Sequence, residues 1–174
     1  MWNDFFPNAI IYGVDNFNGP FLKTKEQNPE FTDQQCAEKV NEIIQSLADQ
    51  GIKVIISDQM DKNTLEAHFD GILFDIVIDD GGHASWQHQK SFEFLWDHVK
   101  PGGFYIIEDL ATCHMREFRE FDDWKSSTLG WIETFNTDNV FSYYIDQEKI
   151  NRIKSEVFSI QIIGELGIIT KKNE

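Results

Sequence analysis

Short apolar runs recur along this chain, and each of them stops at an acidic residue. The runs show no helical period and are bounded by turn residues, so they predict β-strands, and the run at 74–78 predicts a strand buried on both faces. The runs span 9–14, 53–57, 74–78 and 104–107, and the acids that follow them are Asp15, Asp58, the pair Asp79 and Asp80, and the pair Glu108 and Asp109. In an open α/β sheet, ligands bind beyond the carboxyl ends of the strands. These acids therefore mark a candidate site.

Segments with helical spacing lie between the predicted strands. Thr32 and Gln35 form the pattern of a capping box at the start of a helix that Gly51 ends. A short helix is expected at 61–69, and a further helix at 85–99 with Ser85 as its cap. Two more helices are expected at 129–135 and 147–153.

The order of these elements predicts the fold class. Strands that alternate with helices indicate βαβ units and therefore an α/β fold with a doubly wound, mostly parallel, Rossmann-like sheet. The segment 157–170 reads as two strands around a Gly-Glu turn, which predicts a C-terminal antiparallel hairpin. With 174 residues, the chain is expected to form a single domain over 1–174. The charged, aromatic stretch 111–147 fits a lid or a substrate-facing insertion.

Composition narrows the classes of partner. The chain has 30 acidic and 15 basic residues, a net charge of −15, which disfavours nucleic acid and anionic membrane surfaces as partners. No apolar stretch approaches the ~20 residues of a membrane span. Cys36 and Cys113 are too few for a disulfide framework, and residues 1–4 carry no sign of a secretion signal. A cytoplasmic location is the simplest expectation.

A strand-ending acid has an ordinary explanation as well. Aspartate is common at such positions because it forms turns and caps helices. For any one of the four strand ends this explanation is as good as a functional one. Four consecutive acidic ends favour a site.

Two motifs resemble those of a known family. Asp79-Asp80-Gly81-Gly82-His83, together with Glu108-Asp109 after the turn Pro101-Gly102-Gly103, is similar to the class I S-adenosylmethionine-dependent methyltransferases. Within that class, the sequence is similar more specifically to the metal-dependent O-methyltransferases of macrolide sugars and their cephalosporin-hydroxylase-like relatives. It extends through 11–15, 57–59 and the terminal hairpin, and so covers most of the chain outside 111–147.

The resemblance implies an activity and a cofactor site. The expected reaction is a methyl transfer from S-adenosylmethionine, assisted by Mg²⁺, to a hydroxyl of a sugar or of a glycosylated small molecule. Asp15 would hold the ribose hydroxyls of the cofactor, and Asp58 and Gln59 would border its adenine.

The resemblance also implies a metal site and catalytic residues. Asp79, Glu108 and Asp109 would bind the divalent cation, and carboxylates that converge in this way repel one another unless a cation lies among them. Oxygen ligands favour magnesium over zinc. Asp80 and His83 are the candidate catalytic residues, with His83 acting as a base or orienting a metal ligand. A hydrogen bond at the start of a helix would explain His83 equally well.

The sequence departs from the family at two places. Only fourteen residues precede Asp15, and they lack the family's first strand and its glycine-rich loop, so we expect an N-terminally truncated sheet with a gap of ~10 Å at its centre. The missing strand would belong to a longer protein or to another chain, or cofactor binding would be lost. Gln161 occupies a position where the relatives often carry a histidine proposed as the base, and glutamine cannot take a proton.

Two other functions compete with this interpretation. The first is a degenerate, non-catalytic methyltransferase-like module that binds a metal or a partner chain. The second, a nucleotide-sugar enzyme, is disfavoured because no phosphate-binding glycine loop opens a helix. The many aromatic residues and the flank left by the missing strand also favour self-association into a homo-oligomer.

Overall fold

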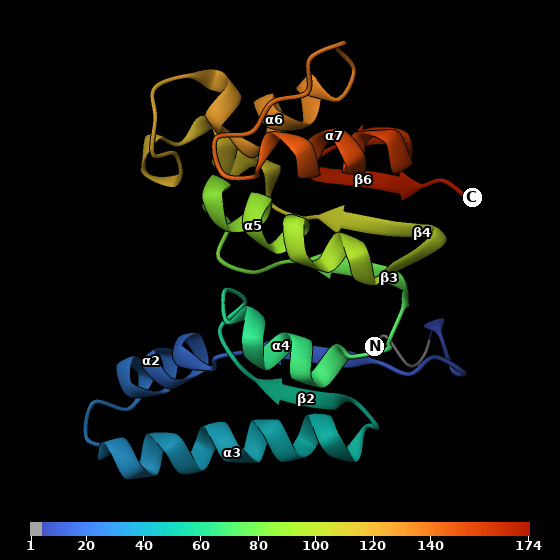
Figure 1. Cartoon of the computed structure of the whole chain (residues 1–174). Coiled ribbons are helices and arrows are strands. Elements are labelled where there is room, and N and C mark those ends of the chain that lie inside the picture. The colour runs from blue at the N-terminus through green and yellow to red at the C-terminus, as the bar shows by residue number, and fades with distance from the viewer. Residues whose placement is uncertain (1–4) are drawn as a thin grey trace. The chain divides into compact units, whose positions relative to one another are not determined.

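The computed structural model describes residues 5–174 (Figure 1). These residues divide into two compact units, with the boundary between His68 and Phe69. The first unit contains a two-stranded parallel sheet of β1 (Tyr12–Asp15) and β2 (Lys53–Ile56). Its helices are α2 (Asn18–Gln27), α3 (Asp33–Asp49) and α4 (Lys62–Phe69), the last of which ends at the unit boundary. The predicted lack of a secretion signal concerns residues 1–4, which lie outside the described residues.

Helix α3 begins and ends where the sequence predicts. The Thr32 hydroxyl accepts a hydrogen bond from the Gln35 backbone N–H at 3.2 Å, and the Gln35 side chain accepts one from the Thr32 N–H at 2.8 Å. Beyond the last turn, Gly51 adopts φ +82°, a conformation that glycine reaches without steric cost. The predicted capping box and glycine stop are confirmed.

The second unit is built on a four-stranded sheet in the order β3-β4-β6-β5. Strands β3 (Phe74–Asp79) and β4 (Val99–Ile107) run parallel, whereas β6 (Leu166–Lys171) is antiparallel to both β4 and β5 (Val157–Ile163). Gly164 turns the β5–β6 hairpin with φ +62°. The α/β class and the C-terminal hairpin are confirmed.

Three α-helices accompany this sheet: α5 (Ser85–Leu95), α6 (Thr128–Thr134) and α7 (Gln147–Glu156). The prediction that Ser85 caps α5 is wrong. The N-cap is Ala84, and the Ser85 hydroxyl instead accepts a hydrogen bond from the backbone N–H of Thr128 at 3.2 Å. The hydroxyl therefore ties α5 to α6, a partner 43 residues away.

The 111–128 stretch consists mainly of short 3₁₀ turns. Its hydrophobic residues therefore do not recur with the period of an α-helix. These turns are η2 (Leu110–His114), η3 (Arg116–Phe118) and η4 (Trp124–Ser126). The following segment enters the core through Trp131, Ile132 and Phe135. A search of the described helices finds no candidate membrane span.

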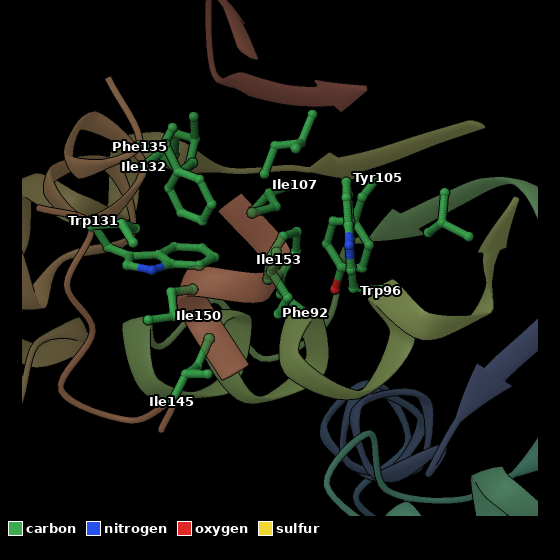
Figure 2. Close-up of a cluster of buried hydrophobic side chains, with 14 of the residues drawn as sticks. Phe92, Trp96, Tyr105, Ile107, Trp131, Ile132, Phe135, Ile145, Ile150 and Ile153 are labelled. Atoms are coloured by element: carbon green, nitrogen blue, oxygen red, sulfur yellow. The ribbon is translucent and has the colours of Figure 1, made fainter. Parts of the chain in front are cut away.

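Aromatic and aliphatic side chains from α5, α6, α7, β4 and β6 form the core on one face of the four-stranded sheet (Figure 2). Phe92 lies at its centre, with ring centroids 4.9 Å from Tyr105 and 5.1 Å from both Trp96 and Trp131. Tyr105 and Ile107 alternate along β4, so both point into this core.

The opposite face of the sheet is much more open. Ile76 is 40% exposed and Phe104 39%. The expectation that the 74–78 strand is buried on both faces is therefore wrong: Val77 packs against the core, while Ile76 points to the open face.

Candidate functional site

The acidic ends of β3 and β4 meet at one edge of the four-stranded sheet. Asp79, the last residue of β3, is in register with Ile107, the last residue of β4. The backbone N–H of Glu108 donates to the Asp79 carbonyl at 3.0 Å. Because the two strands are parallel and end together, Asp80 and Asp109 also emerge at this edge.

Three side chains at this edge form what we call the acid–histidine cluster: Asp80, His83 and Asp109. One potential ligand atom from each lies within 4.8 Å of the others. His83 Nε2 is 3.5 Å from Asp109 Oδ2. Asp80 is exposed and half of the Asp109 side chain is accessible, so solvent and ligands can reach the cluster.

Two members of the cluster have an unusual backbone conformation. His83 and Asp109 both adopt φ 54°, in the left-handed region that few non-glycine residues occupy, although aspartate and histidine tolerate it better than most. The Thr112 hydroxyl lies 2.8 Å from the Asp109 carbonyl oxygen and 3.3 Å from that of His83, so it holds both segments. Backbone held in this way is a feature of functional sites.

Gly82 allows the tight loop that carries His83. The Ala84 N–H donates to the Gly82 carbonyl at 2.7 Å, and a Cβ on Gly82 would collide with the Gln87 side chain. Gln87 Oε1 in turn accepts from the Ala84 N–H at 3.4 Å. A side chain at position 82 would therefore disturb the start of α5 directly beside the cluster.

Asp79 points into the protein and away from solvent. It is 6% exposed, and its Oδ2 accepts a hydrogen bond from the Tyr105 hydroxyl at 2.9 Å. Burial raises the pKa of Asp79 from 3.8 to about 6, against the opposing effect of the Tyr105 hydrogen bond. The Asp79 carboxylate thus already has a hydrogen-bond partner within the protein. Its predicted role as a metal ligand stays a prediction.

The raised pKa of Asp79 predicts a pH dependence of stability in the metal-free chain. The folded state binds this proton more tightly than the unfolded state, so the stabilisation is complete below about pH 4 and is lost as the pH rises through about 6. A chelator keeps the chain free of metal in this test. The unfolding free energy of Asp79→Asn, minus that of the wild type, should then increase by about 2–3 kcal/mol from pH 4 to pH 7. Urea denaturation at several pH values measures this difference. A difference that stays constant with pH contradicts the prediction.

The negative charge of the cluster acts on the neighbouring Glu108 carboxyl. Its pKa is raised by partial burial first and then by the charges of Asp80 and Asp109, while His83 opposes the shift. The carboxylates at this edge therefore repel one another, as the sequence predicts for the two acidic tips. A bound cation would remove that repulsion.

The donor set of the cluster fits a divalent cation. The two carboxylates suit hard cations such as Mg²⁺ and Mn²⁺, with water completing the coordination shell, whereas the imidazole is a softer donor that better suits zinc or iron. The buried Nδ1 of His83 has no hydrogen-bond partner among the described residues, which leaves the ring orientation open to a further partner. Asp80 and Asp109 are the carboxylates of the cluster that could hold the ion. The predicted metal-ligand role of Glu108 and the predicted catalytic role of Asp80 stay predictions.

The predicted cofactor residues lie in the first unit. Asp15 is the last residue of β1 and accepts a hydrogen bond from the Phe17 N–H, and the Ser57 N–H donates to the Asp15 carbonyl at 3.1 Å. Asp58 is exposed and accepts hydrogen bonds from the Met60 N–H at 2.8 Å and the Asn16 side chain at 3.5 Å. Asp15 and Asp58 thus lie at the same edge of the β1–β2 sheet. The roles of these two residues and of Gln59 stay predictions.

Sequence reasoning missed three residues that support the site: Tyr105, Thr112 and His88. Tyr105 could have been found by counting along the strand, because a tyrosine on the face of a buried strand needs a hydrogen-bond partner. His88 belongs to no sequence motif, yet it is fully buried, with a ring centroid 6.1 Å from that of His83. Burial, followed by the charge of His83, lowers the pKa of His88 to about 4. Thr112 gave no signal, because it lies in the stretch without a recognisable pattern.

Comparisons with known proteins point to one group of enzymes. No family model matches the chain. Demethylmacrocin O-methyltransferase of Streptomyces fradiae is 35% identical over 138 residues, which cover 77% of this chain and 29% of the relative. Mycinamicin VI 2''-O-methyltransferase of Micromonospora griseorubida is 34% identical over 120 residues, 68% of this chain and 24% of the relative. The chain therefore spans less than a third of the length of these curated relatives.

A solved structure shares the fold. MycE methyltransferase from the mycinamycin biosynthetic pathway, in complex with Mg, SAH and mycinamycin VI, matches with a TM-score of 0.67 and 23% sequence identity. The match covers 100% of this chain and 40% of that protein.

Proposed function

Because the chain belongs to the class I S-adenosylmethionine-dependent methyltransferase family, we propose that it transfers a methyl group from S-adenosylmethionine to a hydroxyl of a sugar or glycosylated small molecule, with the assistance of Mg²⁺. The observation that carries the proposal is the acid–histidine cluster at the carboxyl ends of β3 and β4. The relatives are named as O-methyltransferases of sugar-bearing compounds, and the MycE structure contains Mg and SAH.

In this proposal, each residue of the cluster has its own role in the reaction. Asp80 and Asp109 would hold a divalent cation, and its charge would lower the pKa of an acceptor hydroxyl. His83 Nε2 would take the hydroxyl proton as the oxygen forms its bond to the methyl group, and the methyl–sulfur bond would break with its electron pair left on sulfur. Asp79 and Glu108 remain candidate metal ligands, and Asp80 remains a candidate catalytic residue.

The first unit would hold the cofactor. Asp15 would accept hydrogen bonds from the ribose hydroxyls, and Asp58 and Gln59 would border the adenine. Support comes from the position of Asp15 and Asp58 at one edge of the β1–β2 sheet, where Asp15 ends β1 and Asp58 lies two residues beyond β2. We further propose that residues 1–174 act as one methyltransferase-like domain, with the stretch 111–147 as a lid or substrate-facing insertion.

Cofactor binding can be tested on the chain itself. Asp15→Asn is expected to weaken S-adenosylmethionine binding about tenfold in isothermal calorimetry with Mg²⁺, because a neutral amide makes a weaker hydrogen bond to a hydroxyl than a carboxylate does. The matched control is Asp49→Asn, an exposed acid at the end of α3 that should leave binding unchanged.

The same titration tests the competing function. A wild-type chain that shows no heat with S-adenosylmethionine, with or without Mg²⁺, would support the non-catalytic module. The named relatives do not favour that alternative, and the cluster with His83 offers a base although Gln161 cannot act as one. We propose a cytoplasmic location and a small-molecule acceptor, without nucleic acid or membrane as a partner; a homo-oligomer stays part of the proposal.

A further inference from the structure

The Thr112 hydroxyl connects the two loops that carry the acid–histidine cluster. It donates to the Asp109 carbonyl at 2.8 Å and to the His83 carbonyl at 3.3 Å. The two acceptors belong to different loops, because His83 comes after β3 and Asp109 comes after β4. A hydroxyl has one proton, so this is a three-centre hydrogen bond in which the contact with Asp109 is the shorter one. One side chain thus joins its own loop to a partner 29 residues away.

Local backbone geometry accounts for only one of these two contacts. A threonine hydroxyl can bond the carbonyl three residues earlier in a helical turn. Thr112 lies in the 3₁₀ turn η2, and its backbone N–H also donates to the Asp109 carbonyl, at 3.0 Å. The contact with His83 has no such local origin, because His83 lies in the other loop. It depends on the way in which the fold brings the two loops together.

The backbones of His83 and Asp109 need support from their surroundings. Both residues adopt φ 54°, and a non-glycine residue persists in the left-handed region only where the structure around it holds it there. The pairing of β3 with β4 ends at the bond from the Glu108 N–H to the Asp79 carbonyl, at 3.0 Å, and so does not extend to His83. The Thr112 hydroxyl carries the connection between the two segments on to the cluster itself.

We infer that Thr112 is a positioning residue of the cluster: its hydroxyl fixes the His83 loop against the Asp109 loop and so sets the spacing of their side chains. The atoms concerned are His83 Nε2 and Asp109 Oδ2, which are 3.5 Å apart. The Thr112 hydroxyl bonds only backbone carbonyls here, so the inference assigns it no contact with metal or substrate. The effect on metal binding rests on the proposed cation site, whereas the effect on the loop does not.

Amide hydrogen exchange of the metal-free chain tests the loop directly. The Ala84 N–H donates to the Gly82 carbonyl at 2.7 Å, so its exchange rate reports the opening of the loop that carries His83. Thr112→Val keeps the shape of the side chain and removes the hydroxyl. The Ala84 amide should then exchange about fivefold faster, the effect of one hydrogen bond. Thr112→Ser keeps the hydroxyl and should stay within about twofold of the wild-type rate.

Thr137→Val is the matched control. The Thr137 hydroxyl also donates to two carbonyls, those of Thr134 at 2.8 Å and Asn139 at 3.1 Å, but both belong to the end of α6 and the loop after it. Its loss removes the same kind of bond and leaves both loops of the cluster intact, so the Ala84 exchange rate should be unchanged. An unchanged Ala84 rate in Thr112→Val, or an equal increase in Thr137→Val, overturns the inference.

Mn²⁺ affinity provides the second readout, which a purely structural role of Thr112 would leave unchanged. Partners that orient metal ligands typically contribute ten- to a hundredfold to metal affinity, so Thr112→Val should bind Mn²⁺ about tenfold more weakly, and Thr112→Ser within about threefold of wild type. Wild-type affinity in Thr112→Val overturns the inference. A wild-type chain that binds no Mn²⁺ refutes the proposed cation site instead, and the Ala84 exchange rate then decides the role of Thr112.

Discussion

Asp109→Asn is expected to reduce Mg²⁺-dependent methyl transfer by about a thousandfold or more and Mn²⁺ affinity by about a hundredfold. Asp109 supplies a charged oxygen to the acid–histidine cluster and lies 3.5 Å from His83 Nε2. A thousandfold loss corresponds to about 4 kcal/mol of transition-state stabilisation, which a misplaced or lost cation can account for. Asparagine keeps the size of the side chain and tolerates the left-handed conformation that Asp109 adopts, so the fold should be retained.

The control for Asp109 is an acid on the same sheet that lies away from the cluster. Asp75 stands near the start of β3, is well exposed and pairs with Lys100 at 2.9 Å. Asp75→Asn should leave metal affinity and methyl transfer within a factor of two or so of wild type, because an exposed ion pair is worth little. Unchanged metal dependence in Asp109→Asn would refute the assignment of the cation site. Electron paramagnetic resonance of bound Mn²⁺ and transfer of a labelled methyl group measure the two effects.

The elements that the sequence predicts well are those specified by neighbouring residues. The capping box of Thr32 and Gln35 depends on four consecutive residues, and the structure reproduces it. Gly51 and Gly164 adopt positive φ at the predicted turns. Such local chemistry is largely independent of the rest of the fold.

Long-range contacts account for the element predictions that fail. Ser85 has the chemistry of a cap, yet its hydroxyl accepts from Thr128 across the chain, and Ala84 takes the capping position. The helix predicted at 129–135 is present as α6, but the burial of Trp131 and Phe135 in the core depends on partners outside that segment. No pattern within the segment itself reveals these partners.

The candidate site was predictable in position and less so in detail. Parallel pairing brings the ends of β3 and β4 together, so the acids meet at one edge as expected. Along β3, however, side chains alternate between faces, which puts Asp79 on the same side as Val77, facing Tyr105 in the core. Counting by two from a core residue would have separated Asp79 from Asp80 before the structure was known.

Phe92→Ala is expected to destabilise the chain by about 3–5 kcal/mol, a large part of the stability of a typical domain. Phe92 is fully buried and contacts three aromatic rings, Trp96, Tyr105 and Trp131, with centroids 4.9–5.1 Å away. Removal of its ring leaves a cavity that these rigid side chains can fill only in part. The midpoint of urea denaturation measures the loss.

The same substitution links the core to the site. Tyr105 packs against Phe92 and also holds Asp79 through its hydroxyl, at the end of the strand that leads to Asp80. We therefore expect Phe92→Ala to weaken Mn²⁺ binding even under conditions where the chain stays folded. Phe158→Ala is the control, since that ring is 72% exposed and its loss should cost less than about 0.5 kcal/mol. Equal losses of stability in the two variants would contradict the view that the core around Phe92 supports this edge of the sheet.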